Sequence, residues 1–208
     1  MKDAQGDSAY GRTNWRRFAV AVGVPTVVAG GLVIGLAQGA FAASFAVSGQ
    51  TFKISADKLD GTGFAQYGDF EHKKDGSLIP VAKSGIATAE LTNLCQSVVV
   101  PGTKFSLTIR AGRGDGNPAV ATDLLIGVDE LSGEATFTNI NIGQDASTLT
   151  KGGDKANQPA GGFGQQADHV VITDLHQTAY STTAGTFKLA GLNMKINLPK
   201  DGAAVECY

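Results

Sequence analysis

The sequence is poor in the residues that most often carry catalysis or bind metals. It has three histidines, His72, His169 and His176, and only two cysteines among its 208 residues. No serine has a glycine two positions before it and two after it, so the nucleophile elbow of many hydrolases is absent. No His, Cys, Asp or Glu set has the spacing of metal ligands. We therefore expect no catalytic, cofactor or metal site.

Charged residues are missing altogether from 18–43, a run of 26 residues. At a helical rise of about 1.5 Å per residue, this run is long enough to cross a hydrocarbon layer of about 30 Å. Arginines at 12, 16 and 17 precede it and keep that end in the cytoplasm. The sequence thus predicts a basic stub over 1–17, a hydrophobic export helix over 18–43, and a domain over 44–208 outside the membrane.

Two outcomes fit this segment. Ala40-Phe41-Ala42 has the small-x-small form that signal peptidase cuts, which would release a secreted domain after Ala42. Alternatively the segment stays as a membrane anchor, because it is longer than the usual signal core. In that case Gly31 and Gly35, four residues apart on one helix face, would allow close contact between membrane helices.

Basic residues are outnumbered in the outer domain. Four basic and two acidic residues precede the apolar segment, whereas 13 basic and 17 acidic residues follow it. A domain with scattered charges and a negative balance lacks the basic patch that binds nucleic acid. We therefore expect no nucleic-acid partner.

The outer domain reads as β-rich. Apolar residues alternate in places between 44 and 56, and turn residues such as 112–118 and 143–145 separate the later apolar runs. The pattern predicts strands near 105–111, 119–128, 135–142, 169–180 and 186–198. The expected fold is mainly β, an elongated β-sandwich or an irregular β-helix. The glycine-rich stretch 143–168 is expected to be a solvated connecting loop.

A short motif recurs four times at uneven spacing. It consists of Thr, then Asn or Asp, then an aliphatic residue, at Thr92-Asn93-Leu94, Thr122-Asp123-Leu124, Thr138-Asn139-Ile140 and Thr173-Asp174-Leu175. In the longest pair an aliphatic residue also precedes the threonine, so apolar residues stand three positions apart and would face opposite ways on a flat strand. A bend or bulge at the Asn or Asp returns both to one core. We expect Leu94, Ile140 and Leu175 to be buried.

The two cysteines, Cys95 and Cys207, both follow the export segment. In an oxidising compartment such a pair is most simply one disulfide. It would close a loop of roughly a hundred residues and fasten the chain end.

Several runs of the sequence resemble an uncharacterised family of exported, Streptomyces-type actinobacterial proteins. The runs are 38–50, 56–64, 89–97, 162–167 and 183–189. Some members of that family are labelled cholesterol esterase, but no hydrolase motif is present here to carry that activity over. The resemblance implies an exported protein and leaves its function open.

Three functional hypotheses follow. The first is a non-enzymatic envelope or extracellular structural protein that is anchored or self-assembles. The second is a carrier for an apolar ligand such as a lipid, held in a groove lined by residues such as Leu124, Leu125 and Ile126 or Phe137, Ile140 and Ile142. The third is a lipid esterase. On a flat strand His169 and His176 face opposite sides, so they would share a site only if a bulge lay between them.

Overall fold

The computed structural model describes residues 46–208 except 115 and 154–159. These residues form ten strands and one short 3-10 helix, in the order β1 (Ala46–Val47), β2 (Phe52–Lys73), β3 (Leu78–Thr92), β4 (Leu94–Val99), β5 (Ser106–Ala111), β6 (Ala119–Thr138), β7 (Asn141–Asp145), η1 (Ala146–Thr148), β8 (Phe163–Thr183), β9 (Thr186–Lys188) and β10 (Asn193–Asn197). The prediction of a mainly β fold is confirmed. The predicted export helix, with Gly31 and Gly35, lies outside the described residues. Among the residues that are described, no helix is long and apolar enough to cross a membrane.

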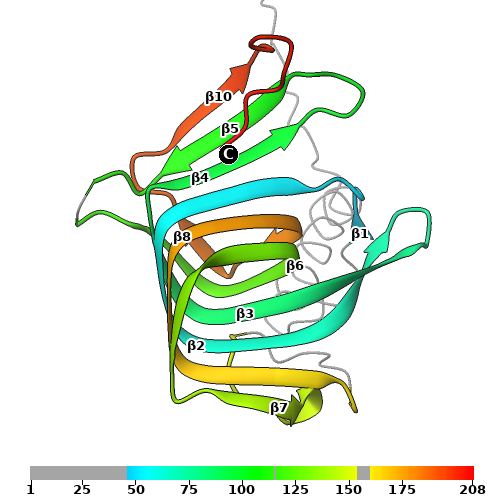
Figure 1. The fold of residues 1–208 in the computed structure, drawn as a ribbon, viewed down its shortest axis with the longest axis vertical. Helices are drawn as coiled ribbons and strands as arrows, with labels where there is room; N and C mark the ends of the chain where they lie inside the picture. The colour runs from blue at the N-terminus through cyan, green and yellow to red at the C-terminus, as the bar shows by residue number, and fades with distance from the viewer. Residues whose placement is uncertain (1–45, 115, 154–159) are drawn as a thin grey trace, which may run out of the picture. The chain divides into compact units, whose positions relative to one another are not determined.

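The four long strands close into one barrel-like sheet (Figure 1). β2 pairs with β3 along one edge and with β8 along the other. β6 pairs with β3 through its first half and with β8 through its second half, which completes the circuit. The sheet therefore encloses its core by closing on itself. This differs from the expected sandwich, which needs two separate sheets, and from a β-helix, whose strands pair in parallel.

The strands bend at the Asn or Asp of the recurring motif. Asn93, Asp123, Asn139 and Asp174 all have φ between 49° and 53°. This left-handed conformation is costly for most side chains but is tolerated by Asn and Asp. The bends are also bonded across the sheet, since Asn93 Nδ2 donates to Asp57 Oδ2 and Asn139 Nδ2 donates to Asp168 Oδ2. The motif is thus a device for turning a long strand through a corner.

Each bend returns both flanking apolar residues to the core, as the motif predicts. Leu91 and Leu94 are both buried, and so are Ile172 and Leu175. Ile140 is only partly buried, although it packs against the same core. The expected burial is confirmed for Leu94 and Leu175, while Ile140 follows the last pairing of β6 with β8 and stays half open to solvent.

Substitutions of Asp174 test the bend without disturbing the packing of the core, because the Asp174 side chain is exposed. We expect Asp174→Val to lower the free energy of unfolding by about 1–2 kcal/mol, the cost of a left-handed conformation in a residue with a branched Cβ. Asp174→Gly should change it by only a few tenths of that amount, because glycine adopts this φ freely. Urea unfolding followed by circular dichroism measures both. Equal losses for Asp174→Val and for Glu134→Val, an exposed strand position outside the bends, would contradict the assignment.

A smaller sheet extends the barrel beyond β2. β4 pairs with the start of β2, β5 pairs with β4, and β10 forms the free edge (Figure 1). One face of these three strands carries the buried residues Cys95, Ser97, Ser106 and Asn197 and is covered by the C-terminal segment. Cys95 and Cys207 form the disulfide that the cysteine count predicts, and Lys53 Nζ donates to the Tyr208 backbone oxygen at 3.0 Å.

The prediction of a solvated loop over 143–168 is wrong at both ends. β7 runs to Asp145, η1 follows, and β8 already begins at Phe163. Ala146 and Leu149 are buried against Ala65 and Tyr67 on the outer face of β2. The glycine content hid these contacts, because small residues let the segment lie close against the sheet.

Candidate functional site

One row of neighbouring side chains leads from the core to the molecular surface. Paired residues in adjacent antiparallel strands point to the same face of a sheet. The register places the following residues side by side across β8, β2, β4, β5 and β10: Gln177, Ile54, Gln96, Ile109 and Met194. Gln177 is 3% exposed and Met194 is 59% exposed. The face that lines the interior of the barrel therefore continues along the small sheet to an exposed position on β10.

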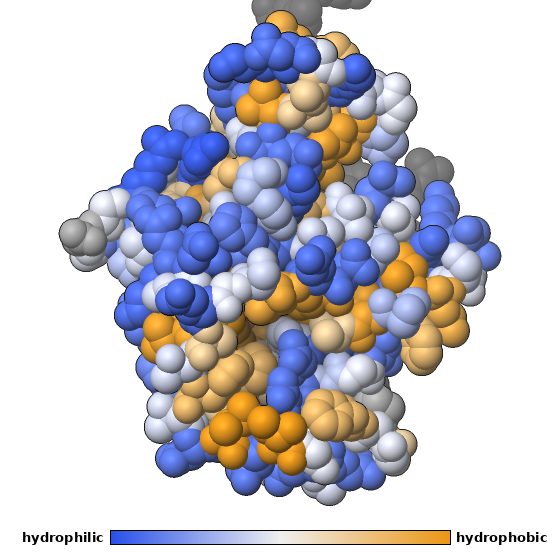
Figure 2. Space-filling model, in the orientation of Figure 1, coloured by the Kyte–Doolittle hydropathy of each residue, from blue (hydrophilic) through white to orange (hydrophobic). Residues whose placement is uncertain are grey.

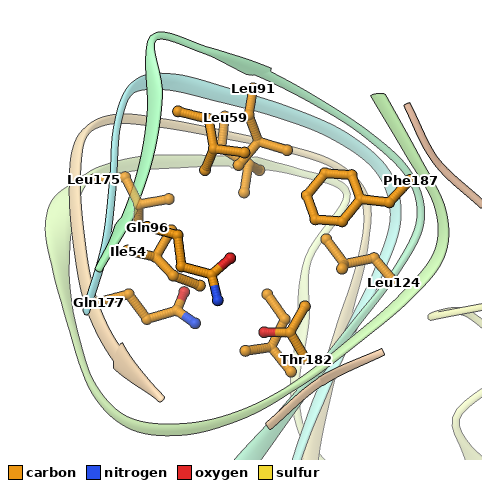
Figure 3. Close-up of a pocket in the computed structure, with 11 residues that line it drawn as sticks. Ile54, Leu59, Leu91, Gln96, Leu124, Leu175, Gln177, Thr182 and Phe187 are labelled. Atoms are coloured by element: carbon orange, nitrogen blue, oxygen red, sulfur yellow. The ribbon is translucent and has the colours of Figure 1, made fainter. Parts of the chain in front are cut away.

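A cavity of about 20 Å³ lies at the inner end of this row. Its wall consists of Ile54, Leu59, Leu91, Leu94, Gln96, Leu124, Ile126, Leu175, Gln177, Thr182 and Phe187. Eight of these eleven side chains are apolar. Figure 3 shows the amides of Gln96 and Gln177 and the hydroxyl of Thr182 directed into the enclosed space between the leucines. A space of this size holds one water-sized group.

Two polar groups in the cavity wall have no hydrogen-bond partner. They are Nε2 of Gln177 and Oγ1 of Thr182, and both atoms are buried. Leaving a buried polar group unbonded costs about 1–3 kcal/mol, so such groups in a folded protein usually meet a water molecule or a ligand. Both unpartnered atoms line one cavity, so a single oxygen atom there, from a water molecule or a ligand, could bond to both.

The cavity wall has no charged side chain. An ionised carboxylate or phosphate would lose its hydration there without gaining a counter-charge. A hydroxyl group both donates and accepts hydrogen bonds, so it satisfies the Gln177 amide and the Thr182 hydroxyl together. The site is therefore suited to the neutral, oxygen-bearing end of an apolar molecule.

Removing the unpartnered Gln177 amide is expected to change the stability of the protein even without a ligand. Gln177→Met keeps the approximate side-chain volume and removes the unbonded amide. We expect it to raise the free energy of unfolding of the ligand-free protein by about 1–3 kcal/mol. Urea unfolding measures the change, with the exposed Gln50→Met as the control. A loss of stability in Gln177→Met, with none in Gln50→Met, would show that the amide is satisfied in the folded protein.

The groove residues expected from the sequence are divided among three environments. Leu124 and Ile126 line the cavity, whereas Leu125 does not. Phe137 and Ile140 pack against the outside of the core, and Ile142 is 65% exposed. The three polar residues of the cavity wall were missed. One signal was available, since taking Asp174 as a bend puts Leu175, Gln177 and Ala179 on the same buried face.

The histidines lie apart from the cavity. The bend at Asp174 reverses the alternation of β8, so His169 and His176 both face outward, which a flat strand would not allow. His169 Nε2 lies 2.6 Å from Asp60 Oδ1. His176 packs edge-on against the ring of Tyr208. Within the part of the chain that the structure describes, neither histidine is hydrogen-bonded to a serine.

Charges near His169 lower the pKa of the Asp60 carboxyl. Lys58 contributes most, through a hydrogen bond, and His169 adds to it while partial burial opposes both. The arrangement is a surface ion-pair cluster that includes Lys58 and Asp60 at 2.6 Å. Over 46–208, leaving aside 115 and 154–159, no three His, Cys, Asp or Glu side chains are grouped to hold a metal ion.

Comparison with known families gives one match, which covers residues 48–208. The chain belongs to DUF6230, a family of unknown function. The match begins just before β2 and includes the whole closed sheet, the cavity residues and the disulfide. No curated protein and no solved structure matches the chain. The prediction of an uncharacterised family is confirmed.

Proposed function

We propose that this DUF6230 protein is an exported, non-enzymatic binding protein that carries an apolar ligand with a neutral, oxygen-bearing end. The observation that supports it is the pair of unpartnered polar atoms, Gln177 Nε2 and Thr182 Oγ1, in a cavity otherwise walled by apolar residues. The cavity accepts the polar end of the ligand. The apolar body extends along the row that leaves the cavity, over Ile109 and Met194.

The size of the cavity sets the binding mode. With room for one water-sized group, it holds the tip of a ligand and not a whole lipid. The rest of the ligand lies on the half-exposed face of β4 and β5, where Val98, Leu107 and Ile109 follow one another. Burial of the ligand's hydrocarbon part supplies affinity at about 0.8 kcal/mol per methylene group, and hydrogen bonds to its polar tip supply selectivity.

Three probes with a ten-carbon chain test the proposal: decan-1-ol, decyl methyl ether and decanoate. We expect decan-1-ol to bind best, the ether less well because it only accepts hydrogen bonds, and the carboxylate at least about tenfold more weakly than the alcohol. Gln177→Met should weaken decan-1-ol binding by about 5–30-fold, the value of one hydrogen bond of 1–2 kcal/mol, and Gln50→Met should not. Titration followed by the backbone NMR signals of residues around the cavity measures these affinities in every protein, and the Gln177 side-chain amide reports on the polar tip in the two proteins that keep it. Equal affinity for all three probes, or no response of that amide, would contradict the proposal.

Self-assembly into an envelope structure is the second candidate function. Among the described strands β10 pairs only with β5, so its other edge could pair with a strand of a second copy. We expect an assembly through this edge to appear as dimers or larger species of the purified full chain, which size-exclusion chromatography with light scattering detects.

A further inference from the structure

Exposed apolar side chains gather on the small sheet of β4, β5 and β10. They are Leu192 at 52%, Met194 at 59%, Ile196 at 74% and Leu198 at 71% exposure, together with Val100 and Phe105 at the hairpin tip between β4 and β5. Figure 2 shows scattered hydrophobic side chains among hydrophilic ones at the end of the molecule that this sheet forms, seen from the side of the C-terminal segment. Soluble domains rarely leave a continuous apolar surface of this kind uncovered unless it contacts a partner.

The two faces of this sheet differ sharply. On the side of Ser97, Ser106 and Asn197, the C-terminal segment supplies polar partners, as the hydrogen bond from Ser106 Oγ to the Val205 backbone oxygen illustrates. The disulfide holds that segment in place. On the other side, Leu107 and Ile109 of β5 stand beside Ile196 and Met194 of β10. Among the described residues, the chain end thus covers the polar face, and no segment covers the apolar one. We call the latter the β10 face.

We propose that the β10 face docks on a lipid bilayer. The chain outside the described residues supports this partner. The uncharged segment ends at Ala43, three residues before β1. β1 pairs with the end of β2 at His72 and Lys73, and five residues later the chain begins β2 beside β4. Nine residues of chain span at most about 30 Å, so a retained anchor keeps the start of β2 within that distance of the bilayer. This inference rests on retention of the anchor, and the docked bilayer would meet Ile109 and Met194, over which the proposed ligand also lies.

The charges around the β10 face fit a lipid surface. Lys200 lies two residues after Leu198, just beyond the end of β10. Lys104 precedes Phe105 at the hairpin tip, but its ammonium group donates to the Gly202 backbone oxygen in the C-terminal segment on the other side of the sheet. Long cationic side chains beside exposed apolar residues are typical of surfaces that lie in the boundary of a bilayer, with the ammonium groups among the headgroups. A second copy of the chain fits less well. Pairing along the β10 edge would leave the apolar face uncovered, and Lys195 on that edge disfavours strand addition.

The single tryptophan, Trp15, allows a direct test in the full chain. In a Trp15→Phe background, Ile196→Trp and Ile142→Trp place one indole on the β10 face or at a control position on β7, where exposure is 74% and 65%. Both proteins are reconstituted in nanodiscs whose lipids carry bromine on the acyl chains. A docked apolar surface lies about 5–10 Å deep, so we expect bromine to quench the indole at position 196 by about half or more and the indole at position 142 hardly at all.

Two results would overturn the proposal. Equal quenching at both positions would show that the domain has no preferred side toward the lipid. No quenching at position 196 would show that something other than lipid covers the face, and two chains per disc by mass photometry would identify a second copy. Matching circular dichroism spectra verify that both variants fold. Neither result bears on the three probes with a ten-carbon chain, so the two proposals fail separately.

Discussion

Replacing Cys95 and Cys207 together by serine is expected to lower the free energy of unfolding by about 4–5 kcal/mol. The two residues are 112 positions apart, so the bond closes most of the described sequence into one loop. In the chain-entropy account, opening a loop of that length releases about this much conformational freedom in the unfolded chain. The loss is comparable to the whole stability of many small domains.

Reduction of the wild-type protein provides the control for this prediction. Urea unfolding of the wild-type chain in a reducing agent should give nearly the same midpoint as the double serine variant, because both have the same open loop. Treating the double serine variant with the same reductant should leave its unfolding midpoint unchanged, because it has no disulfide to reduce. A change below about 1 kcal/mol would mean that contacts of the C-terminal segment, such as Cys207 N to Ser97 Oγ at 3.1 Å, hold the chain end without the bond.

Removing the carboxylate of Glu71 should cost about 3–5 kcal/mol. Glu71 is buried, and its Oε1 accepts hydrogen bonds from Lys83 Nζ and Ser181 Oγ. The Lys83 side chain is also largely buried, with 12% of its surface exposed. Glu71→Met leaves that ammonium group without its counter-charge, which is the most destabilising way to break a buried pair. Gly127 makes the pair possible, because a Cβ there would collide with the Glu71 carboxylate.

The double variant separates charge from packing. Glu71→Met combined with Lys83→Met removes both charges and fills similar volume, so most of the lost stability should return. Asp60→Asn is the matched surface control, since the Lys58–Asp60 pair is far more exposed, and it should cost less than about 1 kcal/mol. Thermal and urea unfolding measure all four proteins. A double variant as unstable as Glu71→Met would show that shape, and not charge, dominates at this position.

The corners of the barrel were predictable because their cause is local. Asn and Asp tolerate a left-handed backbone wherever they stand, and the apolar residues two positions before and one position after them indicate the change of face. Closure between β2 and β8 was not predictable, since the paired residues are 97 to 127 positions apart in the sequence. The length of β2 was hidden for another reason. Its outward positions carry Asp60 and Lys58, and its inward positions include Gly61, so no long apolar run marks it.

The candidate site could not be predicted from the sequence, because it depends on a local bend and on the pairing of two strands that are distant in the sequence. A glutamine in a strand usually points to solvent, and only the bend at Asp174 directs Gln177 inward. Thr182 reaches the same cavity because β8 pairs with β6 beyond the irregularity near Val128. No short motif encodes that meeting. The two cysteines, in contrast, leave one simple pairing, which the structure contains.

The most direct test of the central claim is native mass spectrometry of the full chain, purified in mild detergent from the cells that produce it naturally. We expect about one molecule of a neutral, oxygen-bearing lipid to stay bound to each wild-type and Gln50→Met chain as the detergent is removed. The same lipid should be lost from Gln177→Met, whose cavity has one hydrogen-bond donor fewer. A wild-type chain free of lipid, or one that holds an anionic phospholipid equally in all three proteins, would contradict a ligand site in the barrel.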